Sequence, residues 1–301
     1  MQKKFCWVRR KMEMKNKEKT SKNSITHQKS GVKCKNLCKK GKFKLLFGKI
    51  GAVISKAVYP DDCNCIVCEK EIPKGSKYCL CEQCFRTFPF NNGRICVKCG
   101  SPVGNEANYC IDCQNNTKHF DFVRSSLVYE KEAQRIVLDM KFNNNRWIEK
   151  HFAEMLFDTY NQNHLDAEIV IPVPLSYKRE KQRGYNQALL LAKSLAEKLK
   201  LPLADDVVLK VVDNKQQSSL SARERRENVK GVYNLQNASI VKGKKVLLVD
   251  DILTTGSTLS EISRLLKKAG ASAVYGLVVA SPQYKVPAEQ NEDLTDFEII
   301  S

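Results

Sequence analysis

The sequence predicts an α/β fold, in which helices cover both faces of a doubly wound parallel sheet, with a small cysteine-rich module on its N-terminal side. Between residues 120 and 281, continuous apolar runs alternate with segments of helical periodicity. Upstream, four CxxC pairs follow one another within residues 61–118. Hydrophobic residues make up 42% of the 301-residue chain, which is enough to build a core and argues against global disorder.

The apolar runs have the length of buried strands. We expect strands at 168–174, 207–212, 231–235, 245–250 and 273–280, and helices at 188–199 and 257–269. Strands separated by helices pair in parallel and are covered on both faces. The sequence therefore predicts one α/β domain over residues 119–283, followed by an acidic tail at 284–301.

The positive charge is concentrated near the N-terminus. The net charge is +18, and residues 1–60 hold 18 Lys or Arg against two acids, whereas the other 241 residues hold 33 basic and 31 acidic groups. Residues 1–42 are of low complexity and are predicted to be a disordered basic tail. Such an arm can bind phosphate backbones or anionic lipid, and a merely solvated tail is the alternative.

Residues 43–60 place apolar side chains at i, i+3, i+4 and i+7 up to Pro60, which predicts an amphipathic helix. Docking on the neighbouring domain is favoured over a membrane surface. No run approaches the roughly 18 apolar residues of a membrane span, so no transmembrane segment is expected, and no signal peptide is evident. We expect a cytoplasmic protein, with a peripheral place at the inner face of the membrane as the alternative.

The four CxxC pairs have the spacing of zinc ligands, because two residues between cysteines let both thiolates face one ion. An odd total of 13 cysteines also argues against a disulfide framework. Two such knuckles complete a tetrahedral site, so eight cysteines predict two structural zinc ions. The expected ligands are Cys65, Cys68, Cys81, Cys84, Cys96, Cys99, Cys110 and Cys113.

The sequence leaves open which group the cysteines bind, how the knuckles pair and whether the remaining cysteines take part. An iron–sulfur cluster or redox dithiols are the competing interpretations, and sequential and crossed pairing of the knuckles are both compatible with the spacing. Cys63 and Cys79 each precede a pair by two residues and could substitute for a neighbour. The three cysteines of the basic tail, Cys6, Cys34 and Cys38, are expected to take no part.

Residues 246–259 have the design of a phosphate-binding loop, with the sequence VLLVDDILTTGSTL. An apolar strand ends in two acids, and a Thr/Gly/Ser turn leads into a helix, whose first N–H groups favour an anion. The acids would repel phosphate, so we expect them to face hydroxyl groups such as those of a ribose. The alternative is an ordinary junction with N-capping Thr and Ser residues.

This string resembles the signature of type I phosphoribosyltransferases. The resemblance implies that Asp250 and Asp251 hold the ribose hydroxyls of phosphoribosyl pyrophosphate, with Mg²⁺ as cofactor. It also implies that the 5-phosphate is bound by Thr254, Thr255, Gly256, Ser257 and Thr258. The chain lacks the GKS/T ending of a P-loop.

Further stretches narrow the resemblance to the ComF family, which is associated with bacterial DNA uptake. They are the CxxC knuckles, DMKF, PVPLSYKREKQRGYNQALLLAKSLAEKL and QQSSLSARERRENVKGVY, within residues 53–280. Shorter members keep only the first two CxxC pairs, which implies sequential pairing, Cys65 and Cys68 with Cys81 and Cys84. The family also implies single-stranded DNA and proteins of the DNA-uptake machinery as partners.

The resemblance places two groups of cations near the pyrophosphate. The Pro172-Val173-Pro174 turn, followed by Lys178, Arg179 and Arg183, matches the family's pyrophosphate loop, and residues 213–230 match a loop that closes over the site. The candidate catalytic residues are Arg183, Arg223 and Arg226. Alternatively, the last two are solvated helix charges that pair with Glu224 and Glu227.

The acceptor of the ribosyl group is not indicated. Purine-salvage relatives commonly have an acid where this chain has Thr254, and a threonine cannot exchange protons at neutral pH. The main hypothesis is therefore a phosphoribosyl pyrophosphate-binding protein with Mg²⁺ and zinc. An active phosphoribosyltransferase with an unknown acceptor and a single-stranded DNA-binding adaptor that uses the zinc module are the alternatives.

Overall fold

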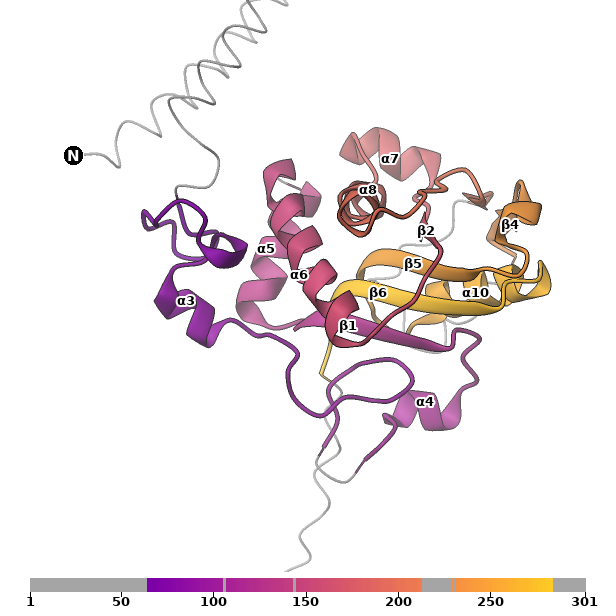
Figure 1. The fold of residues 1–301 in the computed structure, drawn as a ribbon, viewed down its shortest axis with the longest axis horizontal. Coiled ribbons are helices and arrows are strands. Elements are labelled where there is room, and N and C mark those ends of the chain that lie inside the picture. The colour runs from indigo at the N-terminus through magenta and orange to yellow at the C-terminus, as the bar shows by residue number, and fades with distance from the viewer. Residues whose placement is uncertain (1–63, 105–106, 143–144, 213–228, 230, 284–301) are drawn as a thin grey trace, which may run out of the picture. The chain divides into compact units, whose positions relative to one another are not determined.

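The structure, a computed structural model, describes residues 64–104, 107–142, 145–212, 229 and 231–283 (Figure 1). The predicted basic tail at 1–42, the amphipathic helix at 43–60 and the acidic tail at 284–301 lie outside the described residues. The same is true of Arg223 and Arg226. Among the described residues, no helix has the length and apolar character needed to cross a membrane.

A four-stranded sheet lies at the centre of the α/β domain. Its order is β1-β6-β5-β2 and every pair of neighbours is parallel, which confirms the predicted parallel sheet. The strands are β1 (Phe122–Val128), β2 (Ile169–Pro172), β5 (Lys245–Ile252) and β6 (Ala273–Ser281). Alternate residues of β5 enter two cores: Leu247 and Val249 belong to one, Val246 and Leu248 to the other. The strand is therefore buried on both faces, which is why it reads as a continuous apolar run.

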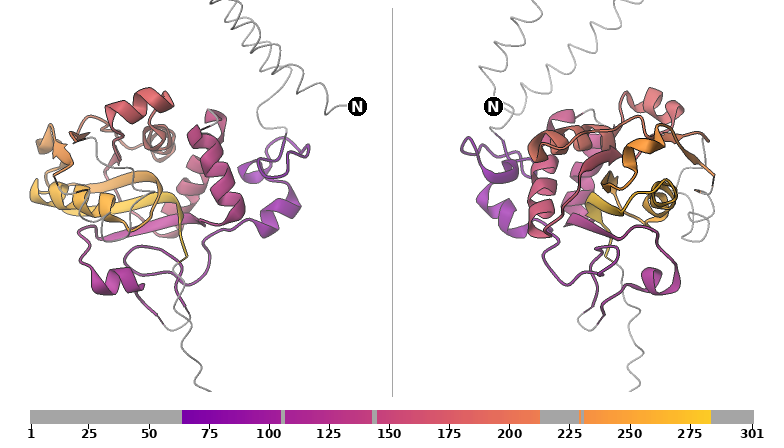
Figure 2. Two further views of the ribbon diagram at one scale, coloured as in Figure 1. Left: turned by 180° about the vertical axis from the view of Figure 1, so that it is seen from behind. Right: turned by 45° about the vertical axis from the view of Figure 1, so that its right-hand side comes forward.

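Helices cover both faces of this sheet (Figures 1 and 2). The core that contains Leu247 is closed by α5 (Lys131–Phe142), α6 (Glu149–Gln162) and α8 (Gln187–Leu199). The opposite core is closed by α10 (Ser257–Lys268). The shorter helical elements are η1 (Lys77–Cys79), α3 (Glu82–Thr87), α4 (Ile111–Asn115), η2 (Arg146–Ile148), α7 (Tyr177–Arg183) and η4 (Ala238–Val241).

Two of the expected strands do not join the parallel sheet. β3 (Val208–Lys210) and β4 (Tyr233–Leu235) pair with each other, antiparallel, and form a separate two-stranded sheet. Both have mixed burial, buried at the first residue and partly or fully exposed afterwards, unlike the wholly buried β2. The expectation that these two runs belong to the parallel sheet was wrong.

The edge strand β1 is covered by the cysteine-rich module. The N–H of Val123 donates to the carbonyl oxygen of Lys98 (2.9 Å), and the N–H of Asn91 donates to that of Ser126 (2.9 Å). The close approach requires Gly100, because a Cβ there would lie 2.4 Å from the carbonyl oxygen of Val123. The module thereby hydrogen-bonds an edge that would otherwise expose unpaired backbone groups.

Candidate functional site

A cavity of about 570 Å³ opens at the carboxyl ends of β2 and β5, where open α/β sheets bind their ligands. It brings two acids together with four cations from separate segments of the chain. The charged residues that line it are Lys141, Arg179, Arg183, Lys210, Asp250 and Asp251. Tyr129, Leu138 and Phe142 form an apolar part of the wall.

The two acids differ in their surroundings. Asp251 forms an ion pair with Lys141, at 2.9 Å between Oδ1 and Nζ, and both side chains are largely buried. Asp250 instead accepts a hydrogen bond from the N–H of Asp251 (2.8 Å) through its Oδ1. Burial, helped by the neighbouring charge of Asp251, raises the pKa of Asp250 to about 7. The pair therefore holds one firmly compensated charge and one group that titrates near neutrality.

The turn after β5 begins helix α10. Gly256 is its N-cap residue and has a φ of 67°, a left-handed conformation that favours glycine. Thr254 and Thr258 line the cavity, whereas the buried side chains of Thr255 and Ser257 hydrogen-bond to each other (2.7 Å). A phosphate in the cavity would thus meet the hydroxyls of the outer two residues and the backbone N–H groups of the helix start.

The predicted pyrophosphate cations are only partly brought to the cavity. Arg179 and Arg183, from α7, line it, whereas Lys178 is exposed and does not. The Arg183 guanidinium lies over the Phe142 ring, 5.3 Å from its centroid, and donates to Oε1 of Gln187 (3.1 Å). These contacts hold the arginine at the cavity wall instead of leaving it free in solvent.

Sequence reasoning missed three polar residues of the wall. Lys141 stands in the DMKF stretch, for which the sequence indicates no role, while Lys210 and Tyr233 come from the β3–β4 pair. Burial is the main cause that raises the pKa of Tyr233 to about 12, and the charge of Asp250 adds to it. Lys141 and Tyr233 stand in stretches that indicate the family but no role for these side chains, and no local pattern marks Lys210, because each meets the acids only through the tertiary fold.

The eight cysteines of the four CxxC pairs form two clusters, and the knuckles pair in sequence. Within each cluster the sulfur atoms lie within 4.8 Å of one another, with 3.7 Å between Cys68 and Cys81 and 3.5 Å between Cys99 and Cys110. Four thiolates around one zinc ion at about 2.3 Å are about 3.8 Å apart, so both clusters fit zinc. The clusters are Cys65, Cys68, Cys81, Cys84 and Cys96, Cys99, Cys110, Cys113.

One of the two extra cysteines lies near the first cluster without joining it. Cys79 is outside the clusters, and its thiol donates to the carbonyl oxygen of Asn64 (3.2 Å). Cys63 lies outside the described residues. Within the clusters, the N–H of Cys84 donates to Sγ of Cys81 (3.4 Å) and that of Cys99 to Sγ of Cys96 (3.5 Å). Such bonds stabilise a sulfur that carries negative charge.

Comparison with known proteins identifies both parts of the chain. Residues 54–114 match the family model of a double zinc ribbon domain, and residues 186–300 match that of a phosphoribosyl transferase domain. The chain therefore combines a phosphoribosyltransferase-type α/β domain with an N-terminal double zinc ribbon, and the two cysteine clusters support structural zinc.

Three relatives match this chain over most of their own length. Competence protein F of Haemophilus influenzae is 34% identical over 227 residues, covering 72% of this chain and 97% of the relative. DNA utilization protein YhgH of Salmonella typhi is 29% identical, covering 66% and 88%. Competence protein ComFC of Bacillus subtilis is 30% identical, covering 64% and 80%. The chain belongs to the ComF family.

Proposed function

We propose that the cavity binds phosphoribosyl pyrophosphate together with Mg²⁺, in a protein that serves DNA uptake or utilization. The supporting observation is that the two acids near the end of β5, the turn into α10 and four cations line one cavity. The names of the relatives, competence and DNA utilization proteins, support the biological setting.

Each part of the ligand would meet a suitable group. The 5-phosphate would be held by Thr254, Thr258 and the first N–H groups of α10, since a helix start favours an anion. The ribose hydroxyls would donate to Asp250 and Asp251. Mg²⁺ prefers oxygen ligands and commonly bridges one or two carboxylates and substrate phosphates, so the same acids and the pyrophosphate fit it.

The pyrophosphate would lie toward the cations of the wall. Arg179 and Arg183 come from the segment after β2, and Lys210 from β3, so the positive groups approach from two sides. Such preorganised cations stabilise the charge of a pyrophosphate, whether it is retained or released. Lys141 would act differently, because its ion pair holds the carboxylate of Asp251 in place.

Binding without turnover is the proposal that the wall supports best. No acid stands at Thr254, where purine-salvage relatives have a proton-transfer group. Transfer to a nitrogen nucleophile remains the enzymatic alternative, and release of pyrophosphate in the presence of candidate acceptors would establish it.

The test is a calorimetric titration of the full chain with phosphoribosyl pyrophosphate, with and without Mg²⁺. The double variant Asp250→Asn/Asp251→Asn should lose roughly 1.5–3 kcal/mol of binding free energy per charged hydrogen bond. The matched control is Asp205→Asn/Asp206→Asn, a pair of adjacent exposed acids outside the cavity. Full affinity in a well-folded Asp250→Asn/Asp251→Asn protein would refute the proposed site.

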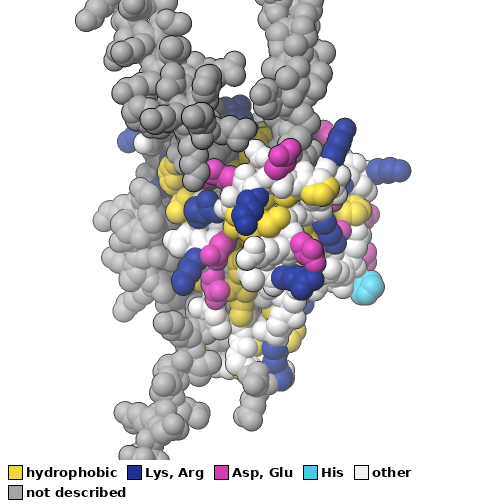
Figure 3. Space-filling model, turned by 90° about the vertical axis from the view of Figure 1, so that its left-hand side faces the viewer, with side chains coloured by type: hydrophobic (Ala, Val, Ile, Leu, Met, Phe, Trp, Pro, Cys, Tyr) yellow, Lys and Arg dark blue, Asp and Glu magenta, His cyan; other side chains and the backbone are white. Residues whose placement is uncertain are grey.

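We propose single-stranded DNA binding by the zinc ribbon as a second candidate. Around the first cluster, the rings of Tyr78, Phe85 and Phe90 lie within 6.1 Å of one another, and Nζ of Lys77 lies 4.9 Å from the Tyr78 centroid. Figure 3 shows Lys and Arg side chains beside hydrophobic ones, with acids interspersed. Aromatic rings beside cations suit stacked bases and phosphates, although only Phe85 of the three rings is substantially exposed.

A further inference from the structure

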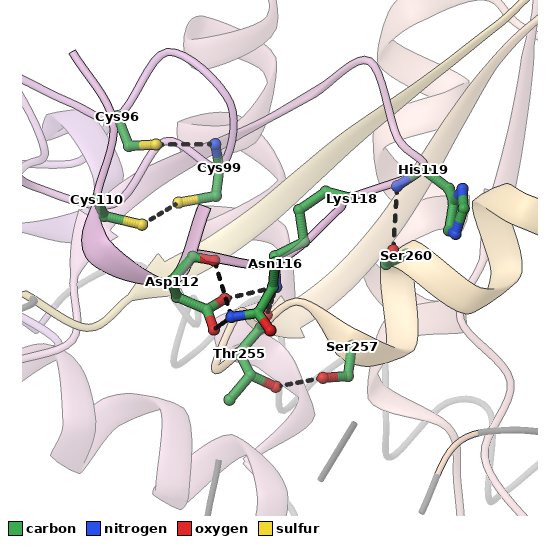
Figure 4. A network of polar contacts seen from close by, with 10 residues as sticks. All are labelled: Cys96, Cys99, Cys110, Asp112, Asn116, Lys118, His119, Thr255, Ser257 and Ser260. Carbon is green, nitrogen blue, oxygen red and sulfur yellow. Dashed lines mark hydrogen bonds and ion pairs between the residues drawn. The ribbon is translucent and has the colours of Figure 1, made fainter. Parts of the chain in front are cut away.

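A single lysine connects the second cysteine cluster to the turn that precedes α10 (Figure 4). Lys118 lies between the cluster and β1, and its side chain is only 3% exposed. Its ammonium group forms an ion pair with Oδ2 of Asp112 (2.5 Å) and donates to the carbonyl oxygen of Thr255 (2.6 Å). A buried ammonium is costly unless it is paired and hydrogen-bonded, so both partners hold it in this position.

The cluster fixes the carboxylate side of this connection. Asp112 belongs to α4, whose N-cap residue is Cys110 and which contains Cys113, so two cysteines of the cluster flank the acid. Nδ2 of Asn116 also donates to Oδ1 of Asp112 (3.0 Å). Closing the cluster around a zinc ion would hold α4, and with it the partner of Lys118, in one arrangement.

The other side of the connection orients a peptide group of the turn. The peptide bond between Thr255 and Gly256 is trans, because the described chain has no cis peptide bond. In a trans peptide the C=O and the N–H point in opposite directions. By holding the carbonyl oxygen of Thr255, Lys118 therefore directs the N–H of Gly256 away from the cysteine module, as one of the donors at the start of α10.

The two residues that follow Lys118 also contact the turn and the first residues of α10. The N–H of His119 donates to Oγ of Ser260 in α10 (3.1 Å), one turn past the helix start. The buried Phe120 ring lies 3.4 Å from the position that a Cβ of Gly256 would occupy. Residues 118–120 thus contact both the turn and α10, and the ion pair of Lys118 with Asp112 links these contacts to the second cysteine cluster.

We propose that Lys118 is a positioning residue for the 5-phosphate turn and that the second cysteine cluster, through Asp112, sets the phosphate affinity of the cavity. The zinc ribbon would then be part of the ligand site and not only a separate module. The inference rests on the proposed function, because it assigns the turn to the 5-phosphate.

The test uses two probes, each of which corresponds to one part of phosphoribosyl pyrophosphate. Ribose 5-phosphate would engage the turn, whereas inorganic pyrophosphate with Mg²⁺ would engage the cations of the wall. Lys118→Met keeps an unbranched apolar side chain of nearly the same length but removes the terminal ammonium group with its charge and donors. It should weaken ribose 5-phosphate binding about tenfold in calorimetry and change pyrophosphate binding by less than about twofold.

Lys267→Met is the matched control. Lys267 also forms an ion pair that reaches from α10 to the segment before β1, with Asp121 at 2.7 Å, but it lies at the far end of the helix from the turn. This control should leave binding of both probes unchanged. Asp112→Asn keeps Lys118 and should give a smaller loss of ribose 5-phosphate affinity, which covers the case that Lys118→Met does not fold.

A pair of cysteine variants tests the metal. Cys110→Ser/Cys113→Ser should lower the zinc content by about one ion per chain and weaken ribose 5-phosphate binding, whereas Cys81→Ser/Cys84→Ser should lower zinc equally and leave this affinity intact. The inference would be overturned if Lys118→Met bound ribose 5-phosphate with unchanged affinity, or if it lost affinity for both probes equally. Either result would leave the proposed function standing. Absence of binding by the unaltered protein would overturn the proposed function as well.

Discussion

Lys141 and Asp251 form an ion pair of 2.9 Å across the candidate site, although 110 positions separate them in the sequence. Lys141 is near the end of α5 and Asp251 near the end of β5, so the pair joins a helix to the central sheet. Both side chains are at most 14% exposed, which removes most solvent screening. The contact thus serves the structure as well as the proposed ligand, because it balances one of two adjacent acids.

Replacing Lys141 should reveal both contributions. In Lys141→Met the carboxylate of Asp251 loses its cation, so we expect the free energy of unfolding to fall by about 1–3 kcal/mol in urea titrations. The charge of Lys141 also lowers the pKa of Asp250, and its loss should raise that pKa further. Lys131→Met, at an exposed position of the same helix, is the control. Equal losses in the two variants would show that the ion pair contributes nothing specific.

The pKa of Asp250 predicts a pH dependence of stability. Because the folded-state pKa is about 7 and the ordinary value is 3.8, the folded protein holds a proton that the unfolded chain releases between these pH values. This group therefore makes folding less favourable as the pH rises through that window. Asp250→Asn should raise the melting temperature more at pH 8 than at pH 5, as differential scanning fluorimetry would show.

The same titration should affect ligand binding in the opposite direction. Only the ionised form of Asp250 can accept hydrogen bonds through both oxygens or bind Mg²⁺. Affinity for phosphoribosyl pyrophosphate should therefore increase between pH 6 and pH 8 in the unaltered protein, and this slope should be absent in Asp250→Asn. A slope that survives the substitution would assign the titration to another group, such as the phosphate itself.

The sheet could be predicted where its strands are buried on both faces. β2, β5 and β6 read as apolar runs for that reason, whereas β1 was not predicted because Arg124, Ser125 and Ser126 interrupt its run. These serines are nevertheless buried, since their hydroxyls bond to Ser281 (2.7 Å) and Thr159 (2.8 Å) from other elements. Only the tertiary structure supplies such partners.

The site could be predicted in part for a similar reason. Asp250, Asp251 and the turn are contiguous in sequence, so together they form a motif that can be recognised from the sequence alone. Lys210 and Tyr233 meet the acids through the antiparallel β3–β4 pair, whose place outside the parallel sheet the sequence did not indicate. These residues could not be assigned to the site because they are far from the acids in the sequence, although their side chains are chemically suited to it.

The cysteine clusters predict the metal content. Protein purified without chelator should contain about two zinc ions per chain, because each cluster offers four thiolates at zinc-compatible separations. Inductively coupled plasma mass spectrometry would measure zinc and iron together. Iron in place of zinc, or metal-free protein in which all thiols react, would contradict the structural zinc sites.

Removing zinc should loosen the packing of each half of the ribbon on the α/β domain, and the two halves pack on different elements of that domain. Near the first cluster, the hydroxyl of Tyr78 donates to Asp158 of α6 (2.5 Å), and the second half covers the edge of β1. A chelator should therefore increase hydrogen exchange at α6 and at β1, while β5, inside the sheet, keeps its protection. Uniform loss of protection would mean instead that the α/β domain cannot fold without the ribbon.

The basic arm gives the last prediction. Residues 1–42 carry 15 Lys or Arg, so their deletion should lower any affinity for single-stranded DNA that arises from charge alone. Each phosphate that a protein neutralises releases counterions, and the number of contacts appears as the slope of log affinity against log salt. We expect the truncated chain to retain binding with a smaller but clear slope, because the family match begins at residue 54. Loss of all binding would assign the DNA contact to the arm. An unchanged slope would instead show that the arm neutralises no phosphate and that the contact lies wholly within the remaining chain, where substitution of Phe85 and Lys77 would then locate it.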